Sequence, residues 1–254
     1  MNLQEILLSL EPRRALALGI GFSIVFYALA ANIGWINRNP GFSRTGQFIH
    51  WTRAAWLPRA LRAIARWAYY LLLPYGTLVA GWNNVRALGL WNLDWLARAP
   101  LALGLTIGSA IVFFWVWRPY ARTEHPDATE SSGWGAARHL IETVYEQAHW
   151  AFYRSGPILW LNDFYWGSCL GLALAFAEGW SNPRVRESVR DITRADTPLW
   201  TGGIAIVSAV LFIFTQNAWY CLAAHLLLDF VLRPLIGFPR PRAGDVRSGD
   251  LSRS

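Results

Sequence analysis

Residues 199–236 read LWTGGIAIVSAVLFIFTQNAWYCLAAHLLLDFVLRPLI, and this run decides the fold class. A helix needs about 20 predominantly apolar residues to cross about 30 Å of hydrocarbon, and the run is nearly twice that long. Thr215, Gln216 and Asn217 interrupt it with a polar turn. The run therefore predicts two helices that cross a membrane in opposite directions.

Further apolar segments of the same kind lie at residues 15–35, 67–82, 101–117 and 158–176, and an amphipathic helical segment lies at 136–153. We predict an all-α, polytopic transmembrane helix bundle of about seven spanning helices, with residues 1–238 in one integral membrane domain. The Trp- and Arg-rich residues 50–56 predict an interfacial helix. The polar residues 239–254 predict a disordered cytoplasmic tail.

The composition agrees with a membrane protein. The 254 residues are 54% hydrophobic and 15% charged, against about 25% charged in an average soluble domain. This much apolar surface excludes a disordered chain, and two Cys residues cannot form a disulfide framework. The net charge of +7 would permit nucleic-acid binding. Since the basic residues flank the apolar segments, we expect the bilayer, and no nucleic acid, as partner.

The basic residues, all of them Arg, predict the orientation. Eighteen of the 23 fall in four stretches, at 37–66, 118–139, 181–197 and 233–254. A count of seven helices places all four stretches on the same side, and positive residues favour the cytoplasmic side. Arg13, Arg14, Arg86, Arg98 and Arg154 fall on the other side. We predict a multi-pass protein of the cytoplasmic membrane with its N-terminus outside and its C-terminus in the cytoplasm.

Ionisable residues within the apolar segments mark a candidate site, because each costs at least about 2.5–3.5 kcal/mol at the bilayer centre. The 136–153 segment carries a stripe with i, i+3, i+4 spacing, made of His139, Glu142, Glu146, His149 and Tyr153. His225 and Asp229 share one face of the last segment. Such stripes must face inward, so we expect Glu142, Glu146, His149, His225 and Asp229 to converge.

Three interpretations of this cluster stay open. A buried carboxylate that activates water would make it a general-base site. Glu146 and His149 have the i, i+3 spacing of carboxylate-bridged metal bundles, so a divalent metal at Glu146, His149, His225 and Asp229 is a second interpretation. The third is structural, with Glu–His and His–Asp pairs that lock the helices together.

The stretch from Gln216 to Phe230, QNAWYCLAAHLLLDF, resembles the closing motif of the CPBP intramembrane proteases, which include type II CAAX prenyl proteases and lysostaphin-resistance-like bacterial proteins. That motif has a polar turn and a Trp before a helix that carries His and, four residues later, Asn or Asp. Upstream, the family has a Glu-Glu-x-x-x-Arg motif, and Arg154 lies 71 residues before His225. The resemblance covers about residues 142–234.

The resemblance implies a glutamate-dependent endopeptidase of a bacterial or archaeal membrane that needs no cofactor and acts on a peptide or protein within the membrane. Arg154 matches the motif Arg, His225 the late His and Asp229 the late Asn or Asp. The two motif Glu positions hold His149 and Trp150 here, and no His lies between His149 and His225. We expect Glu146, one turn earlier, or Glu142 to replace the pair, and His149 to replace the family's middle His.

Two other functions stay open. One is a catalytically inactive membrane scaffold or immunity-like interaction protein, in which the polar cluster is structural. The other is a metal- or haem-binding membrane protein, with His149 and His225 as axial ligands.

Overall fold

The computed structural model describes residues 11–36, 56–91, 95–121, 133–191 and 194–237, and these residues form helices joined by turns, with no strand among them. The predicted all-α bundle is therefore confirmed. The helices are α2 (Pro12–Ile36), α4 (Trp56–Trp67), η1 (Ala68–Leu72), α5 (Leu73–Val79), α6 (Trp95–Ala121), α7 (Gly133–Leu161), α8 (Phe164–Ser181), α9 (Pro183–Arg190), α10 (Asp196–Thr215), α11 (Ala218–Leu227), η2 (Leu228–Leu232) and α12 (Arg233–Ile236).

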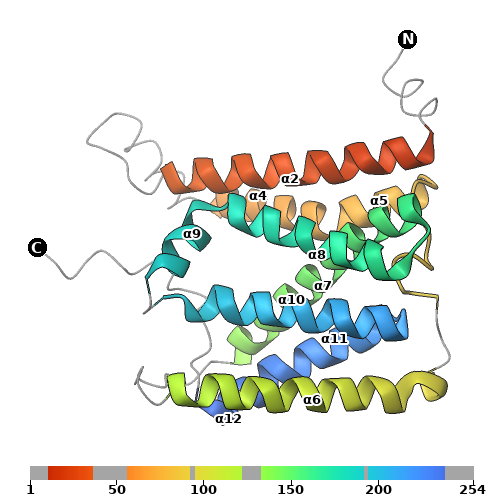
Figure 1. Cartoon of the computed structure of the whole chain (residues 1–254). Helices are drawn as coiled ribbons and strands as arrows, with labels where there is room; N and C mark the ends of the chain where they lie inside the picture. Colours follow the sequence, from red (N-terminus) through yellow and green to blue (C-terminus); the bar gives the residue numbers. More distant parts are fainter. Residues whose placement is uncertain (1–10, 37–55, 92–94, 122–132, 192–193, 238–254) are drawn as a thin grey trace, which may run out of the picture.

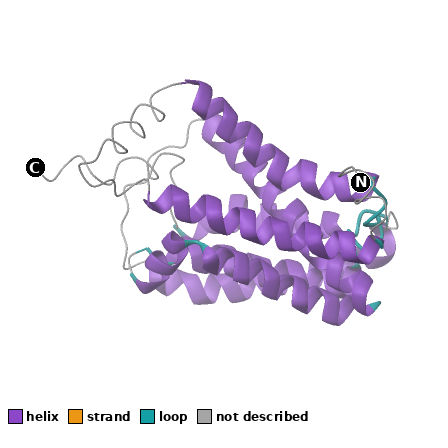
Figure 2. Ribbon diagram, turned by 90° about the horizontal axis from the view of Figure 1, so that it is seen from above, coloured by secondary structure: helices purple, strands orange, loops and turns teal. Residues whose placement is uncertain are grey.

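The long helices lie side by side and follow the chain back and forth (Figures 1 and 2). η1 joins α4 and α5 into one segment, and η2 does the same for α11 and α12. Each long segment runs opposite to the one before it, so Ile36, α9 and Ile236 lie at one end of the bundle, the left end in Figure 1. We call this the α9 end.

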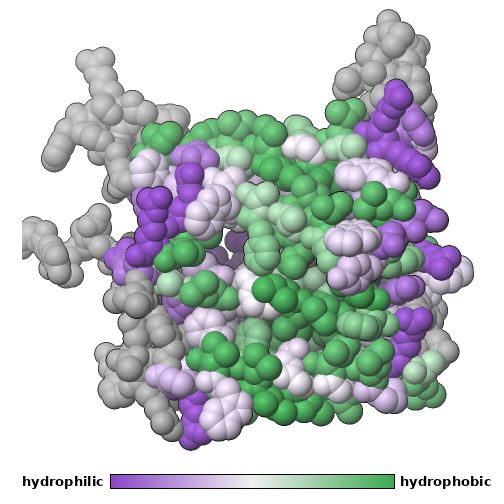
Figure 3. Space-filling view, viewed as in Figure 1, coloured by the Kyte–Doolittle hydropathy of each residue, from purple (hydrophilic) through white to green (hydrophobic). Residues whose placement is uncertain are grey.

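The bundle has the surface of a membrane protein. α2, α6, α10 and the α11–α12 segment are long and apolar enough to cross a membrane. Large apolar side chains such as Phe22, Leu103 and Trp115 are exposed on them. Figure 3 shows an apolar band between two hydrophilic ends. Water would oppose such a surface and lipid would favour it. The count of seven spans stays a prediction.

A polar turn separates the last two long segments, as predicted. Gln216 adopts a left-handed conformation with φ of 52° and ends α10. Asn217 follows, and its side chain accepts a hydrogen bond from the Trp219 backbone N–H at 2.8 Å. This cap satisfies a backbone donor that the first helical turn leaves unpaired.

The helix predicted at 158–176 is present as α8, but its predicted start is wrong, because the same kind of turn divides the run. α7 continues through Pro157 to Leu161. Asn162 is left-handed with φ of 52°, and Asp163 caps α8 by accepting the Trp166 backbone N–H at 2.7 Å. The apolar run continues on both sides of this turn and masks it in the sequence.

Other boundaries also differ from the prediction. The second long segment, predicted at 67–82 with a start further back among Arg62 and Arg66, begins at Trp56 and ends at Val79. Arg154 was assigned to the side of the membrane opposite the Arg-rich stretches, but it lies inside α7 with 2% of its surface exposed. The predicted tail at 239–254 and most of the predicted interfacial segment at 50–56 lie outside the described residues.

Candidate functional site

Helix α7 runs obliquely through the bundle and contacts α2, η1, α8 and α11 (Figure 1). Its closest partner is α8, and the close approach depends on two glycines one turn apart. A Cβ at Gly171 would lie 2.5 Å from Arg154 Cα, and one at Gly167 would lie 2.6 Å from Ile158 Cα. Small residues at this spacing let two helix backbones meet inside a membrane. The polar residues of α7 then form two separate clusters with its neighbours.

The first cluster surrounds the carboxylate of Asp229 in η2, and we call it the Asp229 cluster. Oδ2 lies 3.1 Å from His225 Nε2 and 3.3 Å from His139 Nε2. Oδ1 accepts a hydrogen bond from Trp200 Nε1 at 2.7 Å and lies 3.9 Å from Arg233 Nη1. A buried carboxylate needs such donors, since without them it would lose its hydration uncompensated.

A directed chain of hydrogen bonds leads from Arg154 into this cluster. Arg154 Nη1 donates to Ser208 Oγ at 2.9 Å, and Ser208 Oγ donates to Gln147 Oε1 at 3.0 Å. Gln147 Nε2 lies 2.9 Å from His225 Nδ1. Because the amide nitrogen of Gln147 can only donate, His225 Nδ1 accepts and the Nε2–H points at Asp229. The chain thus joins a buried guanidinium to a buried carboxylate and sets the tautomer of the imidazole between them.

Glu146 connects the Asp229 cluster to the outside. Its Oε2 lies 3.8 Å from His225 Nε2, and its side chain is 38% exposed, whereas that of His225 is 2% exposed. Glu146 is therefore the carboxylate of this cluster that reaches both the buried imidazole and the surface. Figure 3 shows a small opening with a hydrophilic floor on the face that carries α8 and α10, beside α9.

The second cluster lies between α7, α2, η1 and α8, and we call it the Glu178 cluster. Ser23 Oγ lies 3.0 Å from Tyr69 OH, 3.1 Å from Tyr153 OH and 3.5 Å from His149 Nε2. Tyr69 OH donates to Glu178 Oε1, which also lies 3.4 Å from His149 Nε2. All five side chains are buried. Ser23 and Glu178 both approach the same imidazole nitrogen, so a Ser–His–Glu catalytic triad, which needs both nitrogens, does not form.

The expected convergence of five ionisable residues occurs only in part. Glu146, His225 and Asp229 lie together, but His149 belongs to the Glu178 cluster, and Glu142 pairs with Arg66 and lies 3.9 Å from Arg138. The reason is the width of the stripe. At about 100° per residue, His149 lies about 80° around the α7 axis from His139. The two edges of the stripe therefore face different helices.

The metal and haem interpretations do not fit this arrangement. His149 and His225 lie in separate clusters, so the four predicted ligands do not assemble, and no group of three or more His, Cys, Asp or Glu side chains among the described residues could hold a metal ion. The two imidazoles do not face a common space either. His225 stacks on Trp150 with ring centroids 5.5 Å apart, while His149 packs against Tyr153 at 4.5 Å.

Several residues of both clusters were not predicted. His139 was placed on the polar stripe but not in the converging set, and Glu178 was not assigned a partner. Gln147, Ser208 and Trp200 were not identified, nor were Ser23 and Tyr69. A neutral hydroxyl, amide or indole on an apolar helix carries no charge that would mark it in a sequence. Only the intramembrane amide of Gln147, beside Glu146, was a recognisable polar signal.

Tyr69 and Asp229, one from each cluster, lie in the two short π-helical segments, η1 and η2. In each segment the helix widens, and a backbone N–H bonds to the carbonyl five residues earlier, from Leu73 to Ala68 and from Arg233 to Leu228. Tyr69 and Asp229 each precede a proline by five residues, Pro74 and Pro234. Proline lacks an N–H and clashes with the carbonyl four residues before it, and a wider turn accommodates it. π-helical turns are frequent at functional sites.

Comparison of the chain with protein-family models, with curated proteins and with solved structures finds no match.

Proposed function

We propose that this protein is a membrane-embedded hydrolase, a divergent endopeptidase of the CPBP kind, in which Glu146 activates a water molecule and His225 and Asp229 assist. One observation carries the proposal. The Glu146 side chain is 38% exposed, and its Oε2 lies 3.8 Å from the buried His225 Nε2. A general base must contact the water molecule that it deprotonates and lie close to the residue that assists it, which here is His225.

The residues that resemble the family motifs support this proposal. Arg154 and His225 lie 71 residues apart in the sequence, but Ser208 and Gln147 join them into one hydrogen-bonded chain that continues to Asp229. Glu146 belongs to the same turn of α7 as Gln147, so it reaches the site from the position that we expect to replace the family's Glu pair.

The reaction would use the groups as follows. The Glu146 carboxylate takes one proton from water as the water oxygen bonds to the carbonyl carbon of a peptide. His225 Nε2–H, which points at Asp229 in the structure, shifts from that carboxylate to the oxyanion that develops and donates a hydrogen bond to it, while Gln147 maintains the tautomer of the ring. Glu146 then returns the proton to the amide nitrogen as the C–N bond breaks. This chemistry needs no cofactor, and its substrate is a peptide or protein segment that enters the membrane.

The position of the Arg residues supports a multi-pass protein of the cytoplasmic membrane. Arg118, Arg186, Arg190 and Arg194 lie at or near the α9 end, where α6 ends and α10 begins. Positive residues favour the cytoplasmic side. The α9 end would then be cytoplasmic, with α2 beginning on the outer side.

The test is cleavage of a proteome-derived peptide library by the purified full chain in detergent micelles, read by mass spectrometry. We expect the wild type to cut at a shared sequence context and Glu146→Gln to cut at least 100-fold more slowly, since general-base catalysis contributes about 10²–10⁴-fold. Glu142→Gln is the matched control, because this neighbouring Glu pairs with Arg66 outside the cluster. Equal cleavage by wild type and Glu146→Gln, or no cleavage by the wild type, contradicts the proposal.

A second candidate function is a non-enzymatic membrane scaffold or interaction protein. The observation that favours it is the complete internal pairing of Gln147 and Ser208, which link α7, α10 and α11. In this case Glu146→Gln leaves the protein unchanged in every assay, while Gln147→Leu unfolds it at a lower temperature. Absence of cleavage together with that stability pattern would favour the scaffold.

A further inference from the structure

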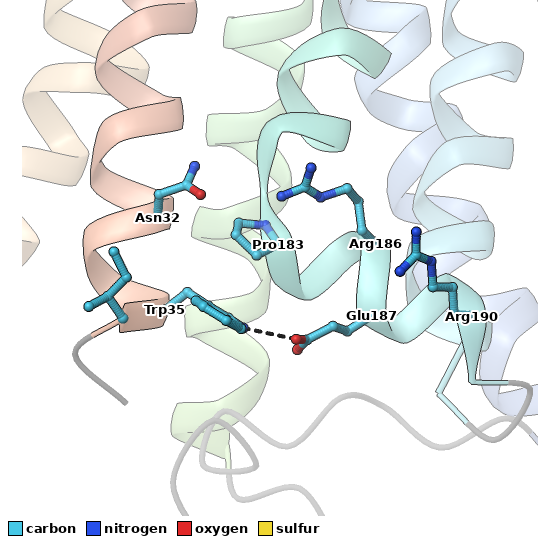
Figure 4. A pocket seen from close by; sticks show the side chains of 7 residues that line it. Asn32, Trp35, Pro183, Arg186, Glu187 and Arg190 are labelled. Carbon is cyan, nitrogen blue, oxygen red and sulfur yellow. Dashed lines mark hydrogen bonds between the residues drawn. The ribbon is translucent and has the colours of Figure 1, made fainter. Parts of the chain in front are cut away.

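A surface pocket of about 300 Å³ lies between α2 and α9, and none of the residues that line it belongs to either polar cluster (Figure 4). Residues from the last turns of α2 form one wall and residues of α9 form the other. They include Asn32, Trp35, Ile36, Arg186, Glu187 and Arg190. The pocket thus combines an amide, an indole and two guanidinium groups at the α9 end of the bundle, where the apolar band meets the hydrophilic surface (Figure 3).

The two guanidinium groups are available for a ligand. Arg186 and Arg190 are one helical turn apart, and neither guanidinium group makes a hydrogen bond or an ion pair with another described residue. Figure 4 shows the Arg186 guanidinium extending toward α2. The carboxylate of Glu187 also reaches α2, where it accepts the Trp35 Nε1–H at 3.1 Å. The lining therefore has one net positive charge and two unengaged cationic groups.

An apolar stripe on α2 leads from the middle of the bundle to this pocket. Val25, Leu29, Asn32 and Ile36 follow the spacing of one helix face. Val25 is 57% exposed, Leu29 58% and Ile36 62%, while Asn32 and Ile36 also line the pocket. In a bilayer this stripe contacts acyl chains, and its last turn places the pocket at headgroup level. Trp35 also suits that level, because Trp prefers the interface.

We propose that this pocket binds the phosphate group of an anionic phospholipid, with Arg186 and Arg190 on the phosphate and the acyl chains along the α2 stripe. Arg groups match phosphate oxygens in charge and in hydrogen-bond geometry. Two features distinguish a lipid from free phosphate, namely the apolar stripe and the interfacial level of the pocket. The net positive lining favours an anionic headgroup over a zwitterionic one.

The experiment measures binding of dioctanoyl phosphatidylglycerol to the full chain in dodecyl maltoside micelles. Dioctanoyl phosphatidylcholine and inorganic phosphate are the comparison ligands. At about fivefold in affinity per basic residue, we expect Arg186→Gln with Arg190→Gln to bind phosphatidylglycerol about 25-fold more weakly. The matched control removes two Arg from the opposite end, Arg13→Gln with Arg14→Gln, and should bind like the wild type.

A variant with the opposite sign separates binding from damage to the fold. Glu187→Gln removes the one negative charge of the lining but keeps a side-chain oxygen that can accept from Trp35. We expect it to bind phosphatidylglycerol about fivefold more tightly, which a damaged pocket would not do. Equal affinity for phosphatidylcholine or for inorganic phosphate overturns the proposal. An equal loss in the control pair, or weaker binding by Glu187→Gln, overturns it as well.

Discussion

The contact between α7 and α8 makes a quantitative prediction for Gly171→Ala. The added Cβ would lie 2.5 Å from Arg154 Cα and 2.8 Å from both Arg154 N and Cγ, whereas ordinary contacts lie at 3.4–4 Å. Two of these three atoms are backbone, so a side-chain rotation cannot relieve the clash. The helices must move apart by about 1 Å, since close-packed interiors leave no spare space.

The cost follows from two opposing terms. Overpacking of this kind costs about 1–3 kcal/mol, while Ala favours a helix over Gly by about 1 kcal/mol. We expect the free energy of unfolding to fall by up to about 2 kcal/mol relative to the wild type, and by about 1–3 kcal/mol relative to a Gly→Ala substitution in α8 that makes no clash.

The assay is unfolding of the purified protein by SDS in mixed micelles, followed by circular dichroism. Gly179→Ala is the matched control on the same helix, because a Cβ there would meet nothing within 4 Å. We expect the control to be as stable as the wild type or slightly more stable. If Gly171→Ala and Gly179→Ala unfold at the same SDS concentration, the close contact of the two backbones does not hold the bundle together, and the reasoning is refuted.

Three further substitutions test the two clusters in the same unfolding assay. Asp229→Asn places an amide N–H where donors surround the carboxylate, and should cost about 1–3 kcal/mol; unchanged stability would contradict this pairing. Gln147→Leu leaves the imidazole of His225 without its donor and should cost a similar amount, and full stability would show that the amide is not needed. Tyr69→Phe removes the hydroxyl that donates to Glu178 and should cost about 1–2 kcal/mol, whereas Tyr70→Phe should cost less; equal losses would argue against the Glu178 cluster.

The helical class and the turn at Thr215–Asn217 could be predicted because apolar length and a polar interruption are both visible in the sequence. The turn at Asn162 and Asp163 could not, since its two polar residues stand in an otherwise continuous apolar run. A short loop of this kind depends on one left-handed residue and one cap. Neither residue produces a sequence pattern strong enough to indicate a turn within a continuous apolar run.

The candidate site was predictable to the extent that charge marks it. Glu146, His225 and Asp229 meet because ionisable residues inside a membrane must turn inward. The prediction failed for His149 because helical spacing identifies a face but not its width, and a stripe of about 80° can serve two neighbours. Ser23 and Tyr69 are neutral side chains, so no charge marks them in the sequence. Only tertiary packing brings them to Glu178.

The widened turns before Pro74 and Pro234 have a consequence for how this bundle can change. A π-helical turn is equivalent to an α-helix with one inserted residue, so removing one residue from η1 or η2 would restore α-helical spacing. Because the wide turn already takes up the extra residue, the α-helices on its two sides would keep their relative orientation. The cost would fall on the turn itself, where Pro74 or Pro234 would meet the carbonyl four residues earlier, a clash that costs about 3 kcal/mol or more. A single-codon deletion would therefore test the role of each wide turn without changing which face the flanking residues present.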